Sequence, residues 1–192
     1  MTKPDQNSVK PSADSIATAA QRFAKSGPAP VHLWNPEFCG DLDMRIARDG
    51  TWFYLGTPIG RKPLVRLFST ILKREGSQYF LVTPVEKVGI QVEDVPFIAV
   101  DFEVVNGPEI IFSTNMDETV SLSAEHPLRL THNSKGEPAP YVHIRDGLEA
   151  RIDRKSFYRL VELATFHNVD NEDWLGVWSL GVFFPMVKSV DL

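Results

Sequence analysis

The feature that most constrains the fold is a pair of short motifs that occurs twice in the same order. Residues 48–50 and 145–147 both read RDG, and basic amphipathic segments follow, RKPLVRLF at 61–68 and RKSFYRLV at 154–161. An Asp-Gly pair between two strand-like segments predicts a β-hairpin. Apolar residues at helical spacing predict a helix after each hairpin. The succession of hairpin and helix is therefore expected twice, which indicates a duplicated α+β core.

A simpler alternative is that the basic segments share only a common way of starting an amphipathic helix. Two motifs in one order, within the same strand–turn–helix succession, favour duplication over this alternative. The apolar spacing predicts one helix over residues 60–76 and a second over residues 154–167. Pro63 falls in the first turn of the first helix, and Asp153 is the expected N-cap of the second.

The loop that the second RDG motif forms sets the strand register. A two-residue Asp-Gly loop would place Ile144 opposite Glu149 and mix the two faces of the hairpin, so we predict a three-residue loop with a left-handed Gly147. This loop aligns Ile144 with Leu148, Val142 with Ala150, Tyr141 with Arg151 and His143 with Glu149. The same loop in the first hairpin aligns Met44 with Tyr54 and Ile46 with Trp52.

Composition shifts and turn signals divide the chain into three predicted parts. Residues 1–30 form a flexible N-terminal segment with a short helix, and residues 31–94 form an N-terminal α+β unit. Residues 95–192 form a C-terminal α+β unit with a larger antiparallel sheet and a helix. The apolar strands after residue 174 have no partner that the pattern identifies.

Charge and apolar patterning exclude several classes of protein. Twenty Lys and Arg against 25 Asp and Glu give a net charge of −5, which argues against a nucleic-acid polymer as partner because phosphate binding needs a basic face. No apolar stretch has the length of a membrane span, and the N-terminus lacks the apolar core of a signal peptide. One cysteine excludes an intrachain disulfide. The expected location is cytoplasmic.

Familiar catalytic motifs are missing from the sequence. It has no phosphate-binding loop, no dinucleotide fingerprint, no nucleophile elbow and no metal-ligand spacing among its five histidines. We therefore predict no metal, no cofactor and a protein that is not an enzyme. Cys39 is expected to be a small buried residue at a strand start. Asp41 and Asp43, two apart on one strand, leave an unrecognised hydrolase open as an alternative.

Cations placed where strands and helices begin are the best candidates for a binding site. The pairs Arg61-Lys62 and Arg154-Lys155 begin the two predicted helices, although solvated surface is the simpler interpretation of either pair alone. Guanidinium groups bind phosphate or carboxylate through paired hydrogen bonds. A groove between the units could therefore hold a small anionic ligand, with Arg61, Lys62, Arg129, Tyr141, Arg145 and Arg151 as its residues. Glu86, Lys87 and Asp94 would lie where the units join, as specificity groups or as an interdomain ion pair.

Several phrases together, including CGDLDMRIARDG, YFLVTPVEK, HPLRL and PYVHIRDGLEARIDRKSFYRL, resemble a proteobacterial family known as a domain of unknown function, over residues 30–185. The resemblance implies a duplicated core with a C-terminal half superficially similar to a pleckstrin-homology-like fold. It also implies a site for a nucleotide-based ligand at the domain interface and a role in signalling. It implies no catalytic residues.

The leading hypothesis is therefore a cytoplasmic α+β protein that binds a nucleotide-like anion between its two units in signal transduction. The alternative from a different class is an interaction module without a small ligand. Edge strands of the middle sheet, or apolar residues near the C-terminus, would then dock a partner protein. The C-terminal candidates are Trp174, Trp178, Phe183 and Phe184.

Overall fold

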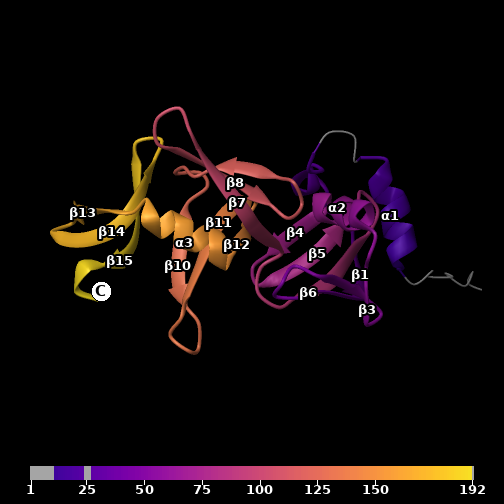
Figure 1. The fold of residues 1–192 in the computed structure, drawn as a ribbon. Helices are drawn as coiled ribbons and strands as arrows, with labels where there is room; N and C mark the ends of the chain where they lie inside the picture. The colour runs from indigo at the N-terminus through magenta and orange to yellow at the C-terminus, as the bar shows by residue number, and fades with distance from the viewer. Residues whose placement is uncertain (1–10, 24–26, 192) are drawn as a thin grey trace, which may run out of the picture. The chain divides into compact units, whose positions relative to one another are not determined.

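The computed structural model describes residues 11–23 and 27–191, which form a mixed α+β structure (Figure 1). The chain divides into two units, Met1–Glu93 and Asp94–Leu192. Within the described residues, three α-helices accompany two six-stranded sheets and one three-stranded sheet. The α+β fold class expected from the sequence is confirmed. Of the predicted flexible segment, residues 1–30, residues 1–10 and 24–26 lie outside the described residues.

The sheet of the first unit has the strand order β3-β2-β1-β6-β5-β4. Only β1 and β6 run parallel, and the other neighbours are antiparallel. The strands are β1 (Phe38–Ile46), β2 (Trp52–Tyr54), β3 (Thr57–Pro58), β4 (Leu72–Glu75), β5 (Gln78–Val82) and β6 (Lys87–Val92). The helices are α1 (Ala13–Gln21), the 3-10 helix η1 (Val31–Leu33) and α2 (Lys62–Thr70).

The core of the first unit joins its first hairpin to α2. The ring of Trp52 on β2 stacks on Phe68 of α2, with ring centroids 6.2 Å apart, and both side chains are fully buried. The register of the hairpin is confirmed, because Met44 pairs with Tyr54 and Ile46 with Trp52. The RDG loop has the predicted three residues: the Gly50 N–H donates to the Ala47 carbonyl, and Gly50 has a φ of 84°. Turn chemistry therefore fixed this register as the sequence indicated.

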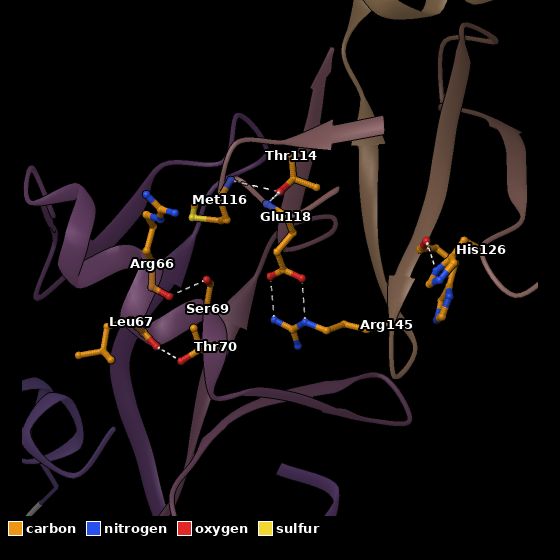
Figure 2. Close-up of polar contacts among 10 residues, drawn as sticks. Arg66, Leu67, Ser69, Thr70, Thr114, Met116, Glu118, His126 and Arg145 are labelled. Carbon is orange, nitrogen blue, oxygen red and sulfur yellow. Dashed lines mark hydrogen bonds and ion pairs between the residues drawn. The ribbon is translucent and has the colours of Figure 1, made fainter. Parts of the chain in front are cut away.

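The first helix is shorter than predicted. The prediction of a helix over 60–76 is wrong, because α2 ends at Thr70 and the next residues form β4. The Ser69 and Thr70 hydroxyls donate to the carbonyls of Arg66 and Leu67, both at 2.7 Å, within the last turn (Figure 2). Leu72 then pairs with Leu81 on β5, so the sheet takes up backbone groups that a longer helix would have used. The spacing of apolar residues alone could not show that the sheet competes with the helix for these backbone groups.

The larger sheet of the second unit has the order β10-β11-β12-β7-β8-β9, with β12 and β7 as its parallel pair. Its strands are β7 (Phe97–Val105), β8 (Glu109–Thr114), β9 (Thr119–Ser121), β10 (Leu128–His132), β11 (Pro138–Arg145) and β12 (Leu148–Ile152). When the strands of each unit are numbered from one to six, both sheets follow the order 3-2-1-6-5-4. The RDG motifs lie at different places in this order, between strands one and two in the first unit and between strands five and six in the second.

The second RDG hairpin keeps three of its four predicted pairs but not the predicted loop, and the predicted pair Ile144–Leu148 is wrong. Tyr141 pairs with Arg151, and the pairs Val142–Ala150 and His143–Glu149 are also confirmed. The three-residue loop is wrong, because Asp146 and Gly147 both have positive φ and form a two-residue turn that sets Arg145 opposite Leu148. The register shifts between His143 and Arg145. This bulge takes up the extra residue, so Ile144 stays buried and the two faces do not mix.

The end of the chain forms a separate sheet, which gives the strands after residue 174 their place. The helix α3 (Arg154–Glu162) is capped by Asp153 as predicted, with the Ser156 N–H donating to its carboxylate at 2.8 Å, but it ends at Glu162 and not at 167. Then β13 (Thr165–Val169), β14 (Glu172–Ser179) and β15 (Val182–Lys188) pair in that order, followed by the 3-10 helix η2 (Ser189–Asp191).

Within the second unit, β14 of the three-stranded sheet packs against α3 (Figure 1). The Ser179 hydroxyl is buried and accepts the backbone N–H of Ile110 on β8 at 3.0 Å. Val177 and Phe184 are buried beside it, which gives the sheet an apolar anchor. Among the described helices of both units, none has the length and apolarity needed to cross a membrane.

Candidate functional site

Three of the residues selected from the sequence form one row across the larger sheet of the second unit. Arg129 on β10 is paired with Tyr141 on β11, and Tyr141 is paired with Arg151 on β12. Residues paired across neighbouring strands point to the same face, so the three side chains share a face. The neighbouring row, Leu128, Val142, Ala150 and Phe97, points to the opposite face, where Val142, Ala150 and Phe97 are fully buried in the core.

Asp94 joins this row from the segment that precedes β7. Its carboxylate accepts a hydrogen bond from the Tyr141 hydroxyl, at 3.0 and 3.2 Å to its two oxygens, and one from Arg151 at 3.2 Å. The side chains of Asp94 and Arg151 are 15% and 26% exposed, so the ion pair is partly shielded from water. Asp94 therefore holds the tyrosine and one arginine in fixed positions.

Glu149 holds the second arginine and was not selected from the sequence. Its two oxygens accept hydrogen bonds from Nε and Nη2 of Arg129 at 2.8 and 2.9 Å, a bidentate pair. The Arg129 guanidinium also lies over the Tyr141 ring, 4.3 Å from its centroid. The hydrogen bonds to Glu149 raise the pKa of Arg129 above its usual value. The predicted register already placed Glu149 on this face, which is the signal that could have identified it.

We call these five residues the arginine–carboxylate cluster: Asp94, Arg129, Tyr141, Glu149 and Arg151. Two guanidinium groups balance two carboxylates, so the cluster has no formal net charge. Beside it, Val95 and Ala139 pack with Tyr141 as a small buried apolar group. The arrangement can offer both hydrogen-bond donors and acceptors to a ligand, next to a rigid aromatic ring.

The buried hydroxyl of Tyr141 predicts a loss of stability at alkaline pH. Burial, followed by the hydrogen bond to Asp94, raises the pKa of Tyr141 above its usual value of about 10. The folded state then holds the proton more tightly than the unfolded chain does, so this contribution is complete below pH 10 and is lost as pH rises through the folded pKa. Tyr141→Phe should flatten the dependence of unfolding free energy on pH above pH 10, measured by urea denaturation.

Tyr158→Phe is the matched control for this experiment, because the Tyr158 side chain is exposed and its hydroxyl accepts from Arg154. The alkaline loss should persist in this variant. An unchanged loss in Tyr141→Phe would show that the cluster does not hold the tyrosine proton.

Arg145 does not join the arginine–carboxylate cluster. The bulge at Ile144 pairs Arg145 with the fully buried Leu148, so the two side chains share the core face. Its guanidinium donates to both Glu118 oxygens at 3.0 and 3.1 Å (Figure 2) and lies 5.4 Å from the centroid of the Phe97 ring. Figure 2 also shows the Thr114 hydroxyl accepting the N–H groups of Met116 and Glu118, which shapes the turn that presents Glu118.

The predicted site residues of the first unit have separate surroundings. Arg61 is the N-cap residue of α2 without a side-chain capping bond, and both Arg61 and Lys62 are exposed. Lys87 pairs with Glu75 and lies over the Phe80 ring, while the backbone of Glu86 closes a turn with Thr83. Lys87 and Asp94 thus each have an ion-pair partner in their own unit.

The residues considered for catalysis lie on β1. Cys39 is exposed, with its thiol donating to the Glu37 carbonyl at 3.3 Å, so the prediction that it is buried is wrong. The β1–β6 register shifts between Phe38 and Asp41, the stretch that contains Cys39, and Gly40 there has a φ of 101°. Burial was predicted from the general preference of free cysteine for protein interiors, and this irregular strand start leaves Cys39 at the surface instead. Asp41 and Asp43 are also exposed, and the Asp41 carboxylate lies against Gly89 of β6.

Comparison with known proteins gives family-level matches. One model, described as the N-terminal domain of a domain of unknown function (DUF1285), matches residues 29–95, and its C-terminal counterpart matches residues 96–186. The chain resembles the crystal structure of a DUF1285 family protein from Silicibacter pomeroyi DSS-3, with 53% identity, a TM-score of 0.83, and 92% of this chain and 96% of that chain covered.

A second crystal structure, of a DUF1285 family protein from Shewanella baltica OS155, shares 30% identity with a TM-score of 0.54. That alignment covers 63% of this chain and 91% of the other. No curated protein matches the sequence.

Proposed function

The chain belongs to the DUF1285 family, and from this premise we propose that it is a non-enzymatic protein that binds a small, anionic, nucleotide-like ligand. The single observation that carries the proposal is the row of Arg129, Tyr141 and Arg151 across three adjacent strands. Binding without chemistry suits a sensor, so the proposed role is in signal transduction. The predicted participation of Arg61, Lys62 and Arg145 stays a prediction.

The two arginines are held in place but retain donors for a ligand. A guanidinium group has five N–H donors. Within the described part of the chain, Arg129 uses Nε and Nη2 toward Glu149, and Arg151 uses Nη1 toward Asp94. The remaining N–H groups can donate to phosphate or carboxylate oxygens. Because the carboxylates already fix the guanidinium planes, less side-chain entropy is lost on binding.

The carboxylates explain why a nucleotide-like ligand fits better than a bare anion. Asp94 and Glu149 balance the charge of the arginines, which weakens the attraction for an ion such as free phosphate. The same carboxylates accept hydrogen bonds, and a nucleotide offers hydroxyl and amino donors along with its phosphate. A ligand with both kinds of group satisfies the whole cluster.

A thermal-shift screen against mononucleotides, cyclic nucleotides and dinucleotides tests this function. A ligand at 100 times its dissociation constant should stabilise the protein by about 2.7 kcal/mol, which raises the melting temperature by several degrees. Arg151→Ala should abolish the shift. Arg151→Lys should lower the affinity for the ligand at least about tenfold, because lysine keeps the charge but loses the planar guanidinium group.

Arg154→Ala is the matched control, since it also removes one arginine from the second unit and breaks one hydrogen bond, to Tyr158. Its ligand response should equal that of the unchanged protein. If no member of the panel shifts the melting temperature, or if the two alanine variants respond alike, the cluster only stabilises the sheet and the proposed function fails.

We also propose that the two units arose by duplication and that the second one is pleckstrin-homology-like in outline. Their shared strand order and the helix that follows the sixth strand of the second unit support these proposals. The different positions of the two RDG motifs mean that the repeated motifs themselves are not the remnant of the duplication.

A further inference from the structure

A hollow of about 340 Å³ lies on the three-stranded sheet, at the end of β14 opposite Ser179. Its lining residues come from both sides of the β13–β14 turn and from η2: Phe166, His167, Asn168, Asp173 and Ser189. The hollow belongs wholly to the second unit, and none of its residues is part of the arginine–carboxylate cluster. It is therefore a site independent of the proposed nucleotide function.

Strand pairing brings the polar and aromatic groups of the hollow together. Phe166 is opposite Leu175 and Asn168 is opposite Asp173, so these side chains share one face of the sheet. The intervening His167 points to the other face, where its ring lies 4.9 Å from both Trp178 and Phe183. The 3-10 helix η2 contacts β14 and brings Ser189 to the same face as Phe166.

The electrostatics of this region favour a cation. Between Thr165 and Asp191 the chain has four carboxylates, Asp170, Glu172, Asp173 and Asp191, against one lysine, Lys188. Lys188 pairs with Glu172 at 2.7 Å, so it does not neutralise the hollow. Within the hollow, the Asn168 amide donates to one oxygen of Asp173 at 2.7 Å and orients the carboxylate.

The exposed aromatic ring provides a second element of cation recognition. Phe166 is 63% exposed, so much of its ring is open to solvent beside the hollow. A guanidinium group can stack on such a ring while it donates to a carboxylate. The hollow lies at the small end of the usual range for ligand pockets, so it suits a single side chain better than a whole cofactor.

We propose that the hollow binds the guanidinium group of an arginine side chain on a partner protein. Asp173 would accept from the guanidinium, Phe166 would stack on it, and the Ser189 hydroxyl would accept a further N–H. The acidic surroundings complement a partner segment that is itself basic.

Titration by NMR with short blocked peptides tests the proposal directly. Acetyl-Gly-Arg-Gly-amide should shift the amide signals of Phe166, Asn168 and Asp173, and the shifts should weaken with added salt. Acetyl-Gly-citrulline-Gly-amide, which keeps the shape but not the charge, should leave these signals unchanged. Asp173→Asn should lower the affinity about tenfold and Phe166→Ala about threefold.

Asp170→Asn is the matched control, because it removes the same charge from the adjacent turn. Asp170 has a φ of 54°, a left-handed conformation that asparagine tolerates well, so this variant should fold and keep the affinity within about twofold. Equal weakening by the two Asp→Asn variants would reduce the effect to general charge and overturn the site. Binding of free agmatine but not of the arginine peptide would overturn the assignment to a protein partner.

Discussion

Replacing Phe97 by alanine is expected to lower the free energy of unfolding of the second unit by about 3–5 kcal/mol, as for other fully buried phenylalanines. Phe97 has no exposed surface and pairs with Ala150 where β7 and β12 run parallel. The Arg145 guanidinium also lies 5.4 Å from its ring centroid. Loss of the ring leaves a cavity and removes one of the surfaces that hold the Arg145–Glu118 pair.

The parallel junction gives this substitution a consequence for the candidate site. Arg151 pairs with Ile98, the residue next to Phe97, so the strand that carries Arg151 is held by the same junction. Phe97→Leu, which keeps most of the volume, should cost about 1 kcal/mol and leave ligand binding intact. Phe97→Ala should loosen β12 and weaken any ligand response of the arginine–carboxylate cluster.

Hydrogen exchange of the β7 and β12 amides, together with urea denaturation, measures this effect within the second unit. Val100→Ala is the matched control, because Val100 is on the same strand but 39% exposed. This variant should lower the free energy of unfolding by no more than about 0.5 kcal/mol. A loss for Phe97→Ala as small as that of Val100→Ala would contradict the packing described for this junction.

The second large effect is expected at Gly176, in the middle of β14. A Cβ atom at this position would lie 2.3 Å from the Phe184 carbonyl oxygen and 2.6 Å from Cζ of Phe183. The register shift between Leu175 and Gly176 is where β15 approaches so closely. Since the carbonyl oxygen belongs to the backbone, Gly176→Ala forces the two strands apart. We expect a loss of about 3 kcal/mol, the upper end for overpacking.

The loss at Gly176 should be local to the three-stranded sheet. Amides of β14 and β15 should exchange faster, and the fluorescence of Trp174 and Trp178 should change. Gly60→Ala is the matched control: nothing lies within 4 Å of its Cβ position and its φ is not positive, so the variant should be neutral or slightly stabilising. Equal stability of the two variants would mean that β14 and β15 do not approach as described.

Only part of the candidate site could be predicted from the sequence. The alternation of polar and apolar residues placed Tyr141 and Arg151 opposite each other, and the structure confirms this pair. The pairing of β10 with β11, which brings Arg129 beside them, could not be predicted. The sequence pattern does not fix the path of the loop between these strands. Glu149 lay on the predicted face, but no local rule showed that it would bind Arg129.

Arg145 is the clearest case of a side chain whose direction local rules could not fix. In a regular strand it would share a face with Tyr141 and His143. The bulge at Ile144 instead turns the Arg145 side chain toward Phe97 and Glu118, both of which are far from it in the sequence. A bulge costs little locally, so its position is decided by which side chains the rest of the fold can bury.

The sequence by itself determined the elements that depend on neighbours along the chain. These are the register of the first RDG hairpin, the register of the second away from its loop, the start of the second helix at its Asp153 cap and the apolar faces of the strands. Turn chemistry and side-chain periodicity act over a few residues, which is why they can be predicted locally. Only the tertiary structure decided where the helices end, which carboxylates hold the arginines and where the last strands pack. Those outcomes depend on backbone groups and charges that meet only after distant segments have paired.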